Sequence, residues 1–180
     1  SIAGTPRLSS RSETRFTVMD IVLVTPEIPQ NTGNVARTCA ALGASLHLVH
    51  PLGFRVDDRS VRRAGLDYWH LLTVHEHASL EAFLAAHADR QLVLFTSHGD
   101  TLYTEIEYDS RSMLVFGSET GGLPRDFVNS GRGLAARIPT VAQARCLNLS
   151  NAVAVAAYEA ARQHSFAGLR CEPVHQNQSD

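Results

Sequence analysis

Short apolar runs recur along the chain and alternate with segments of helical pattern. Each run is almost continuously hydrophobic, so a sheet built from these runs must be covered on both faces. The clearest predicted strands are 20–25, 45–50, 91–96, 111–116 and 134–138. Because strands that alternate with helices tend to pair in parallel, the pattern predicts an α/β domain with a mostly parallel sheet flanked by helices.

Helix signals occupy the intervals between the runs. Gly43 is placed to end a helix that begins near Asn31, and Ser79 is placed to cap the next helix, which runs to residue 86. Further helices are expected over 57–64, 124–129 and 148–164, together with a weaker strand over 71–74.

The length and composition suit a single folded domain. The 180 residues are 44% hydrophobic and 19% charged, as in ordinary globular proteins. Residues 19–168 carry the patterned segments and are expected to form the domain. The polar stretch 1–18, which precedes Met19, is expected to be a disordered or added extension, and residues 169–180 a polar tail.

The sequence shows no sign of a membrane or disulfide-bonded protein. No apolar run approaches the ~20 residues of a membrane helix, and residues 1–18 lack the apolar centre of a signal peptide. Cys39, Cys146 and Cys171 are widely spaced and odd in number, so they suggest no disulfide framework. A reducing cytoplasm is therefore expected, with no membrane partner.

Net charge alone does not indicate a nucleic-acid-binding protein, because it is −2 with a pI near 6.5. All positive charge is nevertheless carried by arginine, whose planar guanidinium suits phosphate groups. The candidates for RNA binding lie close together in one short stretch: Arg55, Arg59, Arg62 and Arg63. The alternative is an ordinary solvated helix face, partly neutralised by Asp57 and Asp58.

A first candidate site segment, Asn31-Thr-Gly-Asn-Val-Ala-Arg37, follows the first predicted strand. Asn34 and Arg37 are three residues apart and share a helix face. An arginine near a helix N-terminus can hold a phosphate or a ribose oxygen. The plain alternative is that Asn31 or Thr32 caps a helix and Gly33 makes a turn.

A second segment, Phe116-Gly-Ser-Glu-Thr-Gly-Gly-Leu-Pro124, follows another predicted strand. Its glycines allow the backbone to approach a ligand closely, and Glu119 can contact a polar group of that ligand. Ligands of open α/β sheets lie beyond the carboxyl ends of the strands, where this loop is expected. The alternative is an ordinary loop between a strand and a helix.

A third segment, 138–152, leads into an alanine-rich helix. The start of that helix is polar, with Asn148, Ser150 and Asn151. Tyr158 lies in its otherwise apolar stretch, and the tyrosine hydroxyl needs a partner. A helix apolar on most faces must be packed on several sides, so a core helix with a polar entrance is the alternative.

In this order the three segments, NxGNxxR, FGxExxGLP and IPxxxxxxxLNLSNA, resemble the SPOUT superfamily of knotted methyltransferases over residues 19–168. Within this superfamily the chain is similar to the minimal single-domain tRNA wobble-nucleotide (cytidine/uridine) 2′-O-methyltransferases. The stretches 51–54 and 62–68 also resemble the corresponding parts of that group. The resemblance implies a C-terminal trefoil knot and an obligate homodimer. It also implies S-adenosylmethionine as methyl donor and the anticodon stem-loop of a tRNA as partner.

The resemblance further implies roles for individual residues. Arg37, Asn34 and Tyr158 would form the catalytic group, with Arg37 acting as a base, as a stabiliser of the developing alkoxide or as a phosphate anchor. In the dimer, Arg37 would serve the cofactor pocket of the partner subunit. The implied cofactor residues are Phe95, Gly117, Glu119, Ile138, Cys146, Leu147, Ser150 and Asn151. Cys146 stands where the closest relatives usually have serine.

Other interpretations have weaker support. No cysteine pair accompanies the histidines, and His75-Glu-His77 lacks HExxH spacing, so no metal site is expected. The stretch 131–136 matches GxGxxA but precedes a strand, contrary to dinucleotide binding. Two alternatives stay open: a ribose methyltransferase for another tRNA or rRNA position, and an RNA-binding relative without catalysis.

Overall fold

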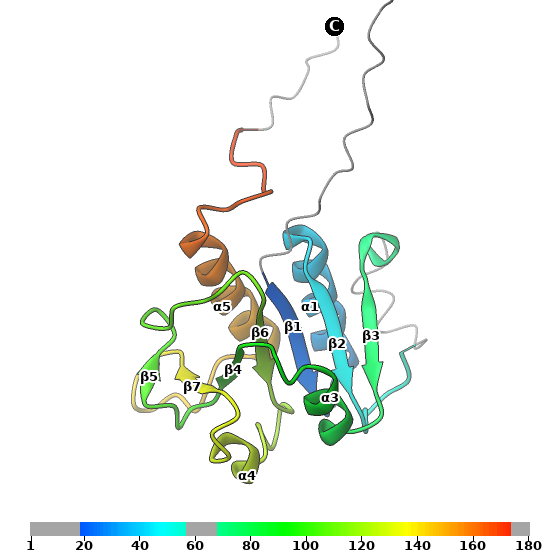
Figure 1. The fold of residues 1–180 in the computed structure, drawn as a ribbon, viewed down its shortest axis with the longest axis vertical. Helices are drawn as coiled ribbons and strands as arrows, with labels where there is room; N and C mark the ends of the chain where they lie inside the picture. The colour runs from blue at the N-terminus through cyan, green and yellow to red at the C-terminus, as the bar shows by residue number, and fades with distance from the viewer. Residues whose placement is uncertain (1–18, 57–67, 174–180) are drawn as a thin grey trace, which may run out of the picture.

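The computed structural model describes residues 19–56 and 68–173. The predicted extension 1–18 and the predicted basic helix 57–64 lie outside the described residues, as does the end of the chain, 174–180. The described strands form one seven-stranded sheet, and every pair of neighbouring strands is parallel (Figure 1). The predicted α/β class is thereby confirmed.

The strand order across the sheet is β3-β2-β1-β6-β4-β7-β5. From β1 the chain adds β2 and β3 toward one edge of the sheet. It then crosses over β1 to form β4, β5, β6 and β7 on the other side, so the direction of strand addition reverses between β1 and β6. Open α/β sheets bind ligands beyond the carboxyl ends of the strands near such a point. The strands are β1 (Met19–Val24), β2 (Ser45–Val49), β3 (Val74–His77), β4 (Leu92–Phe95), β5 (Thr101–Leu102), β6 (Ser112–Phe116) and β7 (Leu134–Arg137).

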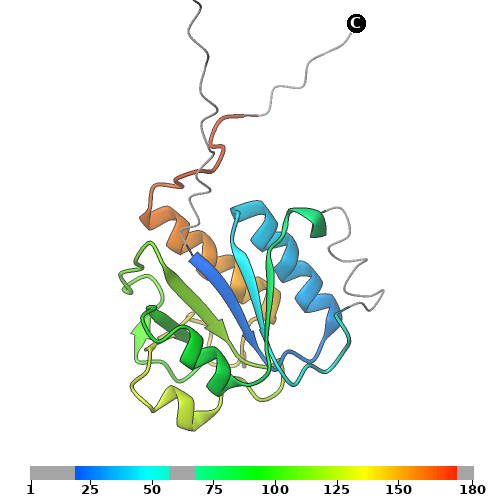
Figure 2. The ribbon, with the colours of Figure 1, turned by 45° about the vertical axis from the view of Figure 1, so that its right-hand side comes forward.

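Helices cover both faces of the sheet (Figure 2). They are α1 (Pro29–Leu42), α3 (Leu80–Ala86), α4 (Arg125–Val128) and α5 (Leu149–Gln163). The helices α1 and α5 pack together on one face, where Ile21 and Leu23 of β1 join their core. On the other face α3 and α4 contribute Phe83 and Phe127 to a second core. No helix within the described residues is long and apolar enough to cross a membrane.

The predicted strand at 71–74 is wrong. A 3₁₀ helix, η1 (Trp69–Leu71), occupies its start, and β3 begins only at Val74. Residues three apart lie on one side of a 3₁₀ helix, and Trp69 and Leu72 both pack against the core while Leu71 is exposed. The two-residue strand β5 was not predicted, because a pair of residues carries no periodic signal.

The first helix begins earlier than the sequence indicated. It starts at Pro29, so Asn31, Thr32 and Gly33 lie inside it and neither cap it nor form a turn. Proline suits the first helical position because its missing N–H needs no partner there. Two other predicted boundaries are confirmed: Gly43 ends α1 with φ 68°, and the side chain of Ser79 caps α3.

Candidate active site

The carboxyl ends of β4, β6 and β7 border a cavity of about 1430 Å³. Pockets for one small ligand usually measure roughly 300–1,000 Å³, so this cavity has room for a cofactor-sized molecule and part of another. All three segments singled out in the sequence line it. The first contributes Asn31, the second residues 116–123, and the third residues 138–140, 145–149 and Ala152.

Two aromatic rings lie side by side where the central strands reach the cavity. Phe95 ends β4 and Phe116 ends β6, and the two residues are paired neighbours in the sheet. Their rings stack with centroids 4.6 Å apart and planes 9° apart. Both residues are almost fully buried, so the pair forms an apolar part of the cavity wall.

The loop after β6 requires glycine at its first position. A Cβ on Gly117 would lie 1.9 Å from the carbonyl carbon of Gly122, because the loop folds back on itself. The amide of Gly122 donates to the carbonyl of Ser118 at 3.0 Å and closes this turn. The sequence suggested that this glycine admits a ligand, whereas the packing of the loop is itself sufficient to require it.

The wall of the cavity after β7 is a segment without regular secondary structure, residues 138–148. Cys146 and Leu147 are exposed there, and Cys146 carries a free thiol. At the start of this wall, the guanidinium of Arg137 donates to the carbonyls of Gly99 and Asp100 at 2.8 Å each. Those bonds hold the loop after β4 beside β7.

Glu119 binds the start of α1. Its carboxylate accepts the backbone amides of Glu27 at 2.7 Å and Ile28 at 3.1 Å. These two amides lie just before and at the N-terminus of α1, where they have no acceptor within the helix. The N-cap residue of α1, Ile28, makes no side-chain cap of its own. A carboxylate is favourable at this positive end of the helix. Glu119 therefore connects the loop after β6 to the loop after β1.

Asn31 extends this connection to the third segment. The Asn31 side chain is almost fully buried, donates to Glu119 at 3.1 Å and accepts from the amide of Asn148 at 3.0 Å. Asn148 in turn caps α5 by accepting the backbone amide of Ser150 at 2.9 Å. One chain of hydrogen bonds thus joins the three segments at the cavity.

The candidate catalytic residues lie outside this cavity, on the exposed surface of α1 and α5. Asn34 and Arg37 are exposed on α1, and Tyr158 is half exposed on α5. The contact that the structure shows for Arg37 is with Tyr68, whose ring centroid lies 5.1 Å from the guanidinium carbon. Tyr68 was not predicted, and a guanidinium over an aromatic face is held by a cation–π interaction.

The predicted cofactor residues separate into two groups. Six of them line the cavity: Phe95, Gly117, Glu119, Ile138, Cys146 and Leu147. Ser150 and Asn151 are not among its lining residues. The hydroxyl of Ser150 is buried and donates to Asn148 at 2.7 Å, so it stabilises the helix cap, while Asn151 is exposed on α5.

Of the predicted RNA-binding arginines only Arg55 lies within the described residues, where it is exposed. Arg59, Arg62 and Arg63 lie outside them. The sequence pattern did not predict that Asn31 and Asn148 hydrogen-bond to each other and so connect the first and third segments. The repeated asparagines in these two segments could have indicated such a contact. Nothing in the sequence pattern indicated that Tyr68 contacts Arg37.

Known proteins share both the sequence and the fold. Residues 19–158 match the SpoU rRNA Methylase family. The tRNA (cytidine(34)-2′-O)-methyltransferase of Methylovorus glucosotrophus (strain SIP3-4) is 45% identical over 155 residues, which cover 84% of this chain and 99% of that protein. A solved structure described as "Structural insights into the 2-OH methylation of C/U34 on tRNA" has a TM-score of 0.79 at 44% identity, covering 82% of this chain and 97% of the other.

A second solved structure, an AdoMet-bound rRNA methyltransferase from Sinorhizobium meliloti, has a TM-score of 0.74 at 28% identity and covers 80% of this chain and 56% of that one. These matches confirm the resemblance inferred from the three segments. The chain belongs to the SpoU rRNA methylase family.

Proposed function

We propose that this protein transfers a methyl group from S-adenosylmethionine to the 2′-hydroxyl of a tRNA ribose, at the cytidine or uridine in the first anticodon position. The observation that carries the proposal is the hydrogen-bonded chain from Glu119 through Asn31 to Asn148, which assembles the three family segments at one cavity. The names of the similar proteins support the position on the tRNA and the nature of the donor.

The residues of the cavity fit this donor. Phe95 and Phe116 make part of the cavity wall apolar, and the largely exposed 138–148 segment could supply polar groups to a purine and a ribose. Gly117, Ile138, Cys146 and Leu147 would hold the molecule. When bound, its sulfonium supplies the methyl group and leaves as a neutral thioether, so the transfer needs no metal.

Arg37 is the group proposed to act on the ribose. A guanidinium stays protonated in proteins and cannot serve as an ordinary base. Its positive charge can stabilise the ribose oxygen as the hydroxyl proton passes to solvent water at this exposed surface. Its planar donors can also hold an adjacent phosphate. The Tyr68 ring contacts the guanidinium from one side, and Asn34, one helical turn earlier, lies on the same exposed surface.

A homodimer is part of the proposal because the catalytic candidates and the cavity do not meet within one chain. Asn151, Val155 and Tyr158 form an exposed stripe along α5, spaced four and three residues apart. Val155 and Tyr158 expose 39% and 47% of their surface, which favours a partner over this stripe. Sedimentation is expected to show a dimer, and a fully active monomer would contradict this part.

Two further parts of the proposal rest on family membership, for the knot, and on the sequence, for the tRNA surface and the location. The trefoil knot is proposed for the path from β7 through the 138–148 segment into α5. The tRNA surface is proposed to include Arg55 with Arg59, Arg62 and Arg63, in a cytoplasmic protein whose tRNA affinity falls steeply as salt rises.

The experiment that tests the proposal separates catalysis from cofactor binding. We expect Arg37→Ala to abolish methyl transfer to tRNA while calorimetry shows nearly unchanged affinity for S-adenosylmethionine. Arg111→Ala is the matched control. Arg111 is an exposed arginine that directly precedes β6, at the end of this strand away from the cavity, and it forms an ion pair with Asp89. Full activity of Arg37→Ala would refute the assignment. Failure of the wild type to bind S-adenosylmethionine would instead support a non-catalytic relative.

A further inference from the structure

A cluster of histidines lies under α3, on the face of the sheet opposite α1 and α5. His75 and His77 alternate along β3 and therefore point to the same face. Parallel pairing places His47 of β2 opposite His75. His87, which follows α3 directly as its C-cap, completes the group. The cluster has no part in the proposed methyl transfer.

Three of these histidines converge. Nδ1 of His47 lies 2.9 Å from Nε2 of His77. The ring centroid of His87 lies 5.1 Å from that of His47 and 5.4 Å from that of His77. One ring nitrogen from each residue lies within 4.8 Å of the other two. A tetrahedral zinc ion holds its nitrogen ligands roughly 3.3 Å apart, so small side-chain rotations would complete such a set.

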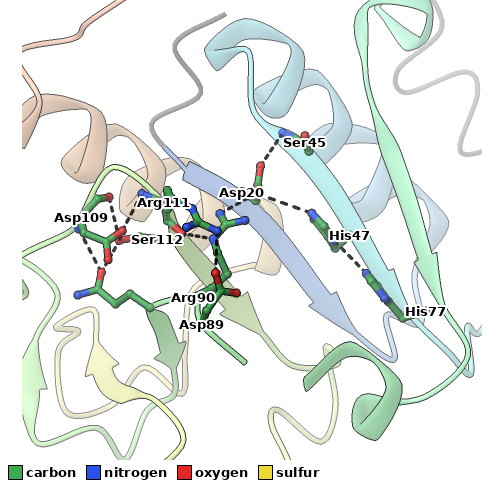
Figure 3. A network of polar contacts seen from close by, with 10 residues as sticks. Asp20, Ser45, His47, His77, Asp89, Arg90, Asp109, Arg111 and Ser112 are labelled. Carbon is green, nitrogen blue, oxygen red and sulfur yellow. Dashed lines mark hydrogen bonds and ion pairs between the residues drawn. The ribbon is translucent and has the colours of Figure 1, made fainter. Parts of the chain in front are cut away.

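The second nitrogen of His47 faces a carboxylate. Nε2 lies 3.9 Å from Oδ2 of Asp20, and a dashed line marks this contact in Figure 3. Asp20 is itself held by Arg90, whose guanidinium donates at 2.9 Å, and by the backbone amide of Ser45 at 3.4 Å. A carboxylate that accepts a hydrogen bond from the far nitrogen of a ligating imidazole is the usual outer partner of a histidine metal ligand. The Asp20 carboxylate lies on that side of His47, at a distance longer than a hydrogen bond.

The cluster is buried on one side and partly open to solvent on the other. His47 is buried, while His77 and His87 are partly exposed, so an ion can reach the cluster from solvent. The carboxylates of Asp20 and Asp89 offset the charge of Arg90 beside the cluster.

We propose that His47, His77 and His87 form a binding site for a divalent transition metal ion such as zinc. Three imidazoles suit zinc, cobalt, nickel or copper, and water would complete the coordination. No metal site was expected from the sequence, because the histidines have neither HExxH spacing nor a cysteine pair beside them. The three proposed ligands come from β2, β3 and the end of α3 and therefore form no local motif. The ion would tie α3 to the edge of the sheet and stabilise this side of the fold.

The test is direct titration of tag-free, EDTA-treated protein with Zn²⁺ and, separately, Co²⁺. We expect one ion per chain by calorimetry and elemental analysis, a tetrahedral Co²⁺ absorption spectrum, and a higher melting temperature with Zn²⁺. His77→Ala and His87→Ala should each weaken Zn²⁺ affinity by more than about tenfold. Loss of a residue that only hydrogen-bonds to a metal ligand already lowers metal affinity by about tenfold or more, and these variants remove a ligand itself.

His70→Ala is the control, because His70 is exposed in η1 and lies outside the cluster. Its metal affinity should match the wild type. The two test positions are partly exposed, so both variants are expected to fold, and circular dichroism verifies this. Wild-type binding below one ion per chain would overturn the proposal. Stoichiometric binding that survives in folded His77→Ala or His87→Ala would overturn it as well.

Discussion

Replacing Glu119 by glutamine tests the connection that holds the start of α1. The change keeps the size of the side chain but turns one accepting oxygen into an NH₂ donor. Either the Glu27 or the Ile28 amide then loses its acceptor and faces a donor. A hydrogen bond to a charged group contributes about 1.5–3 kcal/mol, and water partly compensates at this half-exposed site, so we expect the free energy of unfolding to fall by about 1–3 kcal/mol.

Chemical denaturation of the two proteins, followed by circular dichroism, measures this loss. The matched control is Glu27→Gln. The Glu27 side chain is exposed and accepts only the hydroxyl of Thr120 among the bonds shown for it, and its backbone amide is unchanged by the substitution. We expect this control to change stability by less than about 0.5 kcal/mol.

A double-mutant cycle then tests whether the connection reaches the third segment. Asn31 contacts both Glu119 and Asn148, so Asn31→Ala combined with Glu119→Gln should show a coupling energy of about 0.5–3 kcal/mol. Affinity for S-adenosylmethionine should fall in both single variants. Equal stability of Glu119→Gln and Glu27→Gln, or strictly additive effects, would refute the reasoning.

Three more substitutions probe separate contacts. Tyr68→Leu should lower kcat for tRNA methylation a few-fold with little change in cofactor affinity, because a cation–π contact at an exposed site contributes about 0.5–1 kcal/mol. Tyr68→Phe keeps the aromatic ring and should retain activity. Gly117→Ala should cost about 3 kcal/mol or more in denaturation and abolish cofactor binding, because its Cβ has no space. Thr32→Val should leave stability unchanged or raise it by about 1 kcal/mol, because the buried Thr32 hydroxyl has no hydrogen-bond partner among the described residues. A large loss of stability would contradict this.

The sheet and its main helices could be predicted because their signals are local. Continuous apolar runs marked the buried strands, and Gly43 and Ser79 marked helix boundaries that the structure confirms. The predicted start of α1 was too late because the backbone amides at its true start donate to the Glu119 side chain. Glu119 is 91 residues distant from Ile28 in the sequence. No local pattern reports such a partner.

The candidate site was predictable only in part for the same reason. The residues at the strand ends, such as Phe95 and Gly117, reach the cavity because parallel strands end on one edge of the sheet. The roles of Asn31 and Asn148 depend on a contact across 117 residues. The histidine cluster likewise needs the β2–β3 register before His47 and His77 become neighbours.

Nucleoside mass spectrometry of tRNA tests the central claim most directly. Position-resolved analysis compares cells that contain the protein, cells that lack it, and cells that carry only Arg37→Ala. The account predicts 2′-O-methylcytidine or 2′-O-methyluridine at the first anticodon position only where the wild-type protein is present. Unchanged ribose methylation at that position, or a methyl group that depends on the protein but lies on a base, would contradict it.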